Sequence, residues 1–179
     1  MQSQDILQFW FEELTPRQHF VKDPLIDGAM HRRFGSTVEA ASRCELFGWR
    51  GTAQGRLAEV LVLDQFSRNI FRDTPRAFAQ DRLALMLAQE LVASGQDRSL
   101  PPLRRVFVYM PYMHSESLVI HEQAVALFTQ PGMESNLDFE MRHKDIIERF
   151  GRFPHRNHLL QRASSPSEIA FLSEPGLSF

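Results

Sequence analysis

The chain has 179 residues, of which 43% are hydrophobic and 23% are charged, and its formal net charge is −2 at pH 7. This length and apolar content suit one globular domain with its own core, so we expect residues 1–179 to form a single domain. The nearly balanced charge, with a pI of about 6.4, excludes a protein that holds nucleic acid through bulk positive charge.

Cys44 is the one cysteine in the chain. A single cysteine excludes a disulfide framework and a thiolate metal cluster, and in the helical context SRCELFG we expect it to be a small buried hydrophobic residue. The N-terminal sequence MQSQDILQFWF lacks the basic region and cleavage site of a signal peptide, and the longest apolar stretch, VFVYMPYM, is too short to span a bilayer. The sequence therefore predicts a soluble cytoplasmic protein that contacts no membrane.

Three helices are predicted in the first part of the chain. The first runs from a cap at Ser3 or Asp5 to Leu14. In the second, residues 27–47, large apolar side chains recur every three or four positions, which is the helical period. The third, residues 56–70, is apolar nearly all round at LAEVLVL, so we expect it to be a buried central helix.

Further helices are predicted in the rest of the chain. They cover residues 81–93, Ser115 to Phe128, Ser135 or Asn136 to Phe150, and a short last helix from Ser165. Between them, SLPPLRR is expected to be a loop, and VFVYMPYM suits a strand or a helix, although Pro111 disfavours a central strand. Strand-like alternation is otherwise scarce, so we predict an all-α fold: a single compact domain of six or more antiparallel helices.

Asp64 and Arg68 bring charge to the predicted central helix. Their spacing of four positions places them on one face, in line with its apolar residues. Two interpretations are open. The pair is a structural ion pair that orients the helix, or Asp64 is a pocket carboxylate held by Arg68, with Gln65 and Asn69 as polar neighbours.

His114 and Glu116 lie at the start of a predicted helix, where free backbone N–H groups favour an anion. His121 and His143 interrupt apolar helix faces, where a histidine is most often a hydrogen-bonded core residue. The four side chains are of metal-binding types, but no pair has a strong spacing such as H-E-x-x-H. We therefore predict no metal site, and a metal-dependent hydrolase centred on these four residues stays an alternative.

The segment RFGRFPHRN, residues 149–157, is the centre of a basic patch. Gly151 and Pro154 predict a tight turn that brings its guanidinium groups together, and converging guanidinium groups suit a phosphate or a carboxylate. The alternative is that these arginines cap helix ends and pair with core carboxylates. The candidate ligand-binding residues of this segment are Arg149, Arg152, His155, Arg156 and Asn157.

Four stretches of the chain resemble a bacterial family known as domain of unknown function 924. They are LVLDQFSRNIFR at 61–72, FVYMPYMHSES at 107–117, HKDIIERFGRFPHRN at 143–157 and SSPSEIAFL at 164–172. The resemblance covers essentially the whole chain. It implies a helical fold with tetratricopeptide-like stacking of antiparallel helix pairs, and it implies no activity.

Together, these predictions favour the binding of a small anion, a phosphate or a carboxylate, in a polar pocket. The expected lining is Asp64, Arg68, Asn69, His114, Glu116, Arg149, Arg152, His155, Arg156 and Asn157. If the protein is an enzyme, His114 or Glu116 is its general acid or base. An alternative from a different class is a module that holds a peptide or a partner helix in a helical groove. No cofactor is expected.

Overall fold

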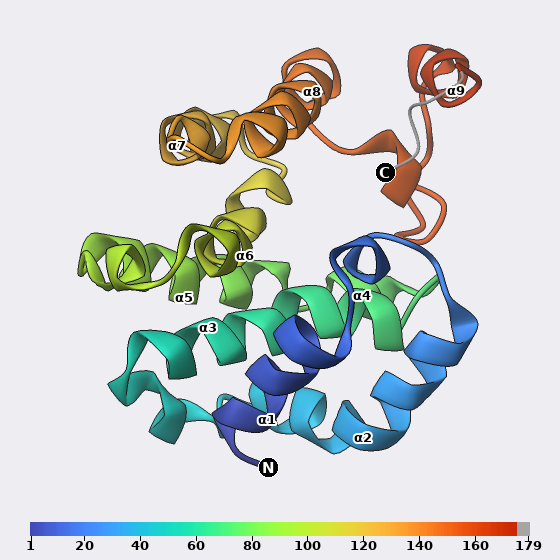
Figure 1. Cartoon of the computed structure of the whole chain (residues 1–179). Coiled ribbons are helices and arrows are strands. Elements are labelled where there is room, and N and C mark those ends of the chain that lie inside the picture. Colours follow the sequence, from blue (N-terminus) through green and yellow to red (C-terminus); the bar gives the residue numbers. More distant parts are fainter. Residues whose placement is uncertain (175–179) are drawn as a thin grey trace.

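A continuous helical run at residues 53–70 lies at the centre of the molecule (Figure 1). It consists of α3 (Ala53–Leu61), a π-helical turn η4 (Val62–Phe66) and α4 (Ser67–Ile70). Thr52 caps the run, since its hydroxyl accepts the Gly55 N–H at 3.0 Å. Residues 57–67 are all buried, so the prediction of a buried central helix is confirmed. The computed structural model describes residues 1–174; the remaining residues of the predicted domain, 175–179, lie outside the described part.

The first two helices pack against this central run. Helix α1 (Ser3–Gln8) contacts α3 and continues through a π-helical turn (Phe9–Glu13), close to the predicted range. Helix α2 (Pro24–Ser42) contacts α4. It begins three residues earlier than predicted because Asp23 caps it and accepts the Leu25 N–H at 2.9 Å.

Cys44 marks the end of α2, earlier than the sequence predicted. Its backbone φ is 59°, in the left-handed region that a continuing helix does not allow. The thiol is free and exposed. The expectation of a small buried residue is therefore wrong. Helix α2 ends at Ser42, so its buried face does not extend as far as Cys44.

The second half of the chain is also helical. Its longer helices are α5 (Asp81–Ala93), α6 (Pro102–Met113), α7 (Leu118–Phe128), α8 (Glu134–Phe150) and α9 (Pro166–Leu172). The bounds of α5 are those predicted, and α8 ends at Gly151, which adopts a φ of 68°. Short 3-10 turns connect several of the helices: η2 (Pro16–His19), η3 (Phe47–Gly51), η5 (Pro75–Phe78), η6 (Gln96–Ser99) and η7 (Pro154–Arg156).

Helix α6 resolves the ambiguous apolar segment. VFVYMPYM is helical and every residue from Val106 to Met113 is buried, so no amphipathic period was there to be detected. The predicted loop SLPPLRR is partly wrong, because Pro102 occupies the first helical position, where a missing N–H costs nothing. Pro111 lies in the last turn and removes a single helical hydrogen bond.

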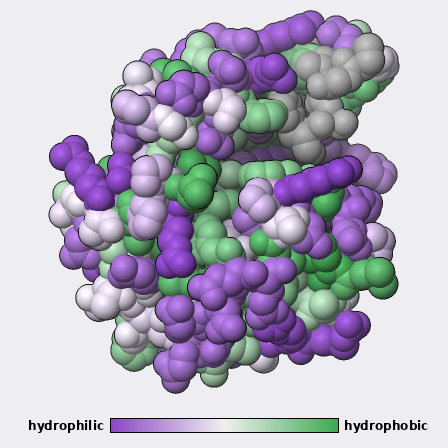
Figure 2. Space-filling model, viewed as in Figure 1, coloured by the Kyte–Doolittle hydropathy of each residue, from purple (hydrophilic) through white to green (hydrophobic). Residues whose placement is uncertain are grey.

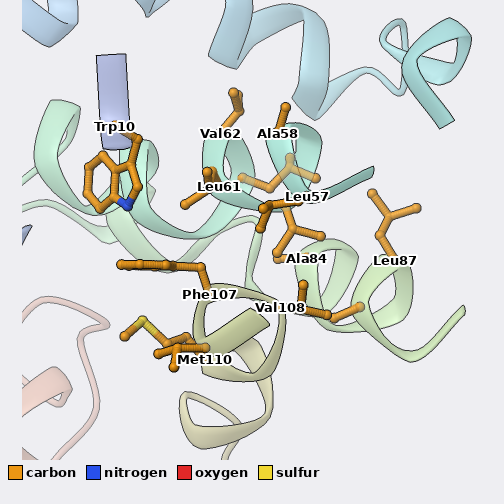
Figure 3. Close-up of a cluster of buried hydrophobic side chains, with 14 of the residues drawn as sticks. Trp10, Leu57, Ala58, Leu61, Val62, Ala84, Leu87, Phe107, Val108 and Met110 are labelled. Carbon is orange, nitrogen blue, oxygen red and sulfur yellow. The ribbon is translucent and has the colours of Figure 1, made fainter. Parts of the chain in front are cut away.

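The apolar core gathers between α1, α3, α5 and α6. Figure 3 shows Leu57 and Leu61 of α3 pointing toward Ala84 of α5 and Val108 of α6. The Trp10 ring packs edge-on against Phe107, with the ring centroids 5.6 Å apart. A second, smaller cluster joins α8 to α9 through Ile146, Ile147, Phe153 and Phe171.

The helices are arranged in layers (Figure 1). Helices α7 to α9 lie on one side of the molecule and α1 to α3 on the other, with α6 between them. On the face shown in Figure 2, hydrophilic side chains cover most of the surface and hydrophobic ones are visible in a central recess. Residues 1–174 contain no strand, which confirms the all-α fold class. Within that range, none of the helices has the length and apolar character that a bilayer span needs. Tetratricopeptide-like stacking stays a prediction.

Candidate functional site

A cavity of about 470 Å³ lies where the start of α5, the α6–α7 junction and the segment after η7 come together. Phe78 and Pro111 supply apolar walls. The charged and titratable side chains that line it are Asp81, Arg82, His114, Glu116, Arg156 and Arg162. A small concave site with a few polar groups among apolar walls is typical of a small-molecule site.

Asp64 lies beneath this cavity, in the π-helical turn of the central run, and is fully buried. Its Oδ1 accepts from Nη1 of Arg68 at 2.9 Å and from Nδ1 of His114 at 2.8 Å, and its Oδ2 accepts from the Gln65 amide at 2.6 Å. Burial opposes ionisation, but Arg68 and His114 outweigh it and hold the pKa of the Asp64 carboxyl well below its usual value. Asp64 is therefore a fixed negative charge. Asp64 thus forms the ion pair with Arg68 that one of the two interpretations predicted. Its role as a pocket carboxylate stays a prediction, since Asp64 bonds the cavity residue His114 but is not itself part of the lining.

Arg68 joins Asp64 to Asp81. Its Nη2 donates to Oδ2 of Asp81 at 3.0 Å, and its Nη1 lies 2.9 Å from Oδ1 of the same carboxylate. Asp81 in turn accepts from Nη1 of Arg156 at 3.2 Å. Five side chains of alternating character thus form one chain of contacts, here named the cavity network: His114, Asp64, Arg68, Asp81 and Arg156.

Arg156 is the least satisfied cation of this network. The side chain is only 7% exposed, and its guanidinium carbon lies 4.8 Å from the Phe78 ring centroid and 4.5 Å from that of Phe153. Its Nε has no hydrogen-bond partner in the described part of the chain, and Asp81 is its one ionic partner there. Burial, and then the charge of Arg68, lower the pKa of Arg156 to about 10. The carboxylates of Asp81, Glu116 and Asp64 act in the opposite direction but do not compensate for the burial of this guanidinium.

His114 ends the network on the other side. Its Nδ1 is bonded to Asp64, while its Nε2 makes no hydrogen bond among residues 1–174. Burial, and then repulsion from Arg68, lower the pKa of His114. The ring is therefore neutral near pH 7 and carries its proton on Nδ1, because only a protonated Nδ1 can donate to the ionised Asp64.

Glu116 differs from His114, although the sequence proposed the two as alternative acid–base groups. Its Oε1 accepts from the Phe153 N–H at 2.8 Å and from Nη2 of Arg162 at 2.9 Å, and its Oε2 accepts from Nη1 of Arg162 at 2.6 Å. Burial raises the pKa of Glu116, but these bonds outweigh it and leave a net lowering. A carboxylate with all these partners is suited to anchoring the segment after α8.

Arg152 and Asn157 also belong to this anchor and do not line the cavity. Arg152 makes two hydrogen bonds of 2.7 and 2.8 Å to Glu168 in α9. Asn157 donates to Glu168 at 3.2 Å, and its side-chain oxygen accepts from Nε of Arg162 at 2.9 Å. Arg152, Asn157, Arg162, Glu116 and Glu168 are here named the C-terminal network. These arginines follow the alternative interpretation of the basic patch, in which they pair with carboxylates.

The remaining predicted ligand-binding residues lie apart from one another. Asn69 donates to Asp27 of α2 at 2.9 Å. Arg149 is exposed and lies over the Phe150 ring, 4.7 Å from its centroid. His155 is partly buried beside Phe153, and burial with the nearby charge of Arg156 lowers its pKa to about 4. The predicted convergence of three guanidinium groups is wrong, because Gly151 ends α8 and the following turn sends Arg149, Arg152 and Arg156 to different partners.

The four candidate metal ligands are not brought together either. His121 is fully buried, with Nδ1 2.7 Å from Oε1 of Glu140 and Nε2 2.8 Å from the Ser115 carbonyl oxygen. Nδ1 of His143 donates to the Phe139 carbonyl oxygen at 2.8 Å. Among the described residues, no group of three or more His, Cys, Asp or Glu side chains is arranged to hold a metal ion.

Sequence reasoning missed three charged residues of the cavity. Asp81 was used only to mark the start of a helix, and Arg82 and Arg162 were not proposed as site residues. Asp81 carried no separate signal, because an acidic residue in a first helical turn is explained by the helix dipole alone. Asp81 comes to lie between Arg68 of α4 and Arg156 of η7 only in the tertiary structure, in which α5 packs against the central run at η4.

The fold and the cavity define an all-helical protein with a buried ionic network that opens on a small polar cavity. The chain belongs to the family described as bacterial protein of unknown function (DUF924), whose model matches residues 6–176. This confirms the family resemblance seen in the sequence. A solved structure, that of the protein of unknown function ATU0120 from Agrobacterium tumefaciens, is 40% identical, covers 96% of each chain and has a TM-score of 0.91. None of the curated proteins matches this chain.

Proposed function

We propose that the protein binds a small anion, a phosphate or a carboxylate, in the cavity lined by Arg156. The observation that carries this proposal is the state of the Arg156 guanidinium. It is buried, it has one ionic contact at 3.2 Å, and its Nε is unbonded within residues 1–174. A buried cation is normally paired and hydrogen-bonded. Because Arg156 lines the cavity, an anion bound there would add negative charge beside this guanidinium.

The charges around the cavity support the same proposal. Arg82 lies at its edge, is exposed and makes no ion pair among the described residues. Arg162 is already neutralised by Glu116. Arg82 and Arg156 are therefore the two cations with capacity for a ligand, and a guanidinium group suits two-pronged contacts to phosphate or carboxylate oxygens.

The test is a thermal-shift titration with inorganic phosphate and with acetate. A ligand at about one hundred times its dissociation constant should stabilise the protein by about 2.7 kcal/mol. The shift should vanish in Arg156→Met, which keeps the length of the side chain and removes its charge. Arg149→Met is the matched control, since Arg149 comes from the same nonapeptide and is exposed. A shift that survives in Arg156→Met would contradict the proposal.

Two other functions were predicted from the sequence. The groove-binding module stays a prediction, and a protein that responds to no anion but retains a partner would favour it. A metal-dependent hydrolase centred on His114, Glu116, His121 and His143 loses its support, because these side chains are engaged with other partners. A cytoplasmic location is part of the present proposal.

A further inference from the structure

His114 presents a lone pair, and no proton, to the cavity. Asp64 holds the Nδ1–H at 2.8 Å, and this carboxylate is itself fixed by Arg68 and Gln65. With the proton on Nδ1, the neutral ring has only an acceptor at Nε2. That Nε2 makes no hydrogen bond in the part of the chain that the structure describes, and the ring lines the cavity.

An acceptor and a cation make opposite demands on a ligand. Arg156 needs an anionic oxygen, whereas Nε2 of His114 needs a hydrogen-bond donor. A fully deprotonated anion would set an oxygen lone pair against the lone pair of the imidazole, which is unfavourable because Nε2 would then have no hydrogen-bond donor. An anion that also carries a hydroxyl group satisfies both groups.

The hydrogen-bond acceptor of His114 and the cation of Arg156 can act on one ligand, because the cavity network holds both at the same cavity. His114, Asp64, Arg68, Asp81 and Arg156 are joined by consecutive contacts of 2.8 to 3.2 Å, and its two end members, His114 and Arg156, line the same cavity. Because Asp64 is fully buried, the histidine cannot turn its ring without leaving that carboxylate bonded to Arg68 and Gln65 alone. The acceptor and the cation are therefore held in a fixed relation.

We propose that the cavity selects anions that carry their own hydroxyl donor, such as hydrogen phosphate or a hydroxy acid, over anions of the same shape that lack one. This selectivity rests on the proposed function, since it presupposes that the cavity binds an anion. It assigns the anionic oxygen to Arg156 and the hydroxyl to Nε2 of His114. Sulfate, which carries no proton near neutral pH, is the matched tetrahedral anion without a donor.

Two matched pairs of probes test this selectivity by isothermal titration calorimetry of the full chain near neutral pH and at matched ionic strength. The first pair is inorganic phosphate and sulfate, and the second is glycolate and its methyl ether, methoxyacetate. In each pair that binds, the member with a hydroxyl should bind at least about tenfold more tightly, which corresponds to about 1.4 kcal/mol. The two pairs also distinguish a phosphate ligand from a hydroxycarboxylate ligand.

His114→Ala should remove the preference and bring the members of each pair within about threefold of each other, because the acceptor is gone while Arg156 remains. His31→Ala, at an exposed histidine of α2, is the control and should keep the preference. If His114→Ala does not fold, the comparison of the paired probes on the wild-type protein still decides the question.

The outcomes separate the two proposals. Equal binding of phosphate and sulfate, and of glycolate and methoxyacetate, would overturn the selectivity and leave the anion cavity in place. Binding of no probe would overturn both proposals. A preference that persists in His114→Ala would show that another group reads the hydroxyl, and would overturn the assignment to His114.

Discussion

The cavity network and the C-terminal network use the same residue types but differ in how fully their groups are bonded. Glu116 and Glu168 of the C-terminal network accept bonds at all four carboxylate oxygens. The cavity network ends in two groups with spare capacity within residues 1–174, Nε2 of His114 and Nε of Arg156. A completed network positions backbone segments, whereas a network whose two end members line a cavity and keep unused hydrogen-bonding capacity indicates a place for a ligand.

The same contrast separates two arginines that lie four positions apart in RFGRFPHRN. Arg152 makes two bonds to Glu168 and ties the segment after α8 to α9. Arg156 instead pairs with Asp81 at the start of α5, and Asp81 is in turn paired with Arg68 of the central run. The two residues carry the same polar signal in the sequence, but we expect their substitutions to have opposite effects on stability and on anion binding.

The largest effect is expected from removing the buried charge at the centre of the cavity network. Asp64→Asn should lower the free energy of unfolding by about 3–5 kcal/mol, because Arg68 would lose the carboxylate that balances its buried charge. Glu45→Gln is the matched acid-to-amide control at an exposed ion pair with Arg43 and should change stability little. Urea unfolding measures both. A loss below about 1 kcal/mol for Asp64→Asn would mean that the network contributes little to the fold.

Acid is expected to destabilise the layer that contains α8 and η7. Burial lowers the pKa of His143 to about 3 and that of His155 to about 4, from an ordinary value of 6.5. Below pH about 6.5 the two histidines bind protons in the unfolded chain but not in the folded protein. The unfolding free energy therefore falls as the pH falls. The slope is about 1.4 kcal/mol per pH unit for each ring until the folded pKa is reached.

Unfolding midpoints in urea at pH values between about 7 and about 5 measure this loss, which should reach about 2–4 kcal/mol for the two rings together. His143→Gln and His155→Gln should each flatten the profile. His31→Gln, at an exposed site, should not. A profile that is the same in all three variants would assign the acid sensitivity to the carboxylates.

A smaller effect is expected from the C-terminal network. Asn157→Ala should cost about 1–3 kcal/mol, because the buried amide bonds to Glu168, Ser164 and Arg162 are lost together. Asn136→Ala, at an amide with no hydrogen bond among the described residues, is the control. Thermal unfolding of the pair measures the difference. Equal midpoints would show that the hydrogen bonds of the Asn157 amide contribute nothing to stability.

The smallest effect on stability is expected at Arg156. Arg156→Met should change the unfolding free energy by no more than about 1 kcal/mol, because Asp81 keeps its ion pair with Arg68 and the buried cation is replaced by an apolar side chain of similar length. Anion binding should nevertheless be lost. Arg152→Met should do the reverse, with a lower melting temperature and intact anion binding. If both variants lose stability and neither loses binding, the distinction between the two networks is wrong.

Local signals in the sequence were sufficient for the helices whose ends carry them. Residues 81–93 were bounded correctly, and Gly151 ended α8 as predicted. The errors came where local and tertiary preferences differ. The segment 106–113 had no amphipathic period because α6 is buried on every side, and Cys44 was assigned to a helix that stops two residues before it.

The candidate site divides in the same way. Asp64, Arg68, His114 and Arg156 were proposed from the sequence and do belong to one network. The residues that connect or complete the site, Asp81 and Arg82, carried no motif. Asn69 and Arg152 carried the same polar signal as the network members, but their partners are Asp27 and Glu168.

The sequence by itself determined the helical class, most helix boundaries, the family and the polar residues worth considering, because these depend on neighbours a few positions apart. Only the tertiary structure decided which of those residues share a cavity. That choice depends on contacts such as His114 with Asp64 and Arg156 with Asp81, between residues 50 and 75 positions apart. Such pairings are set by how α5, α6 and the segment after α8 pack on the central run, and no local pattern in the chain encodes them.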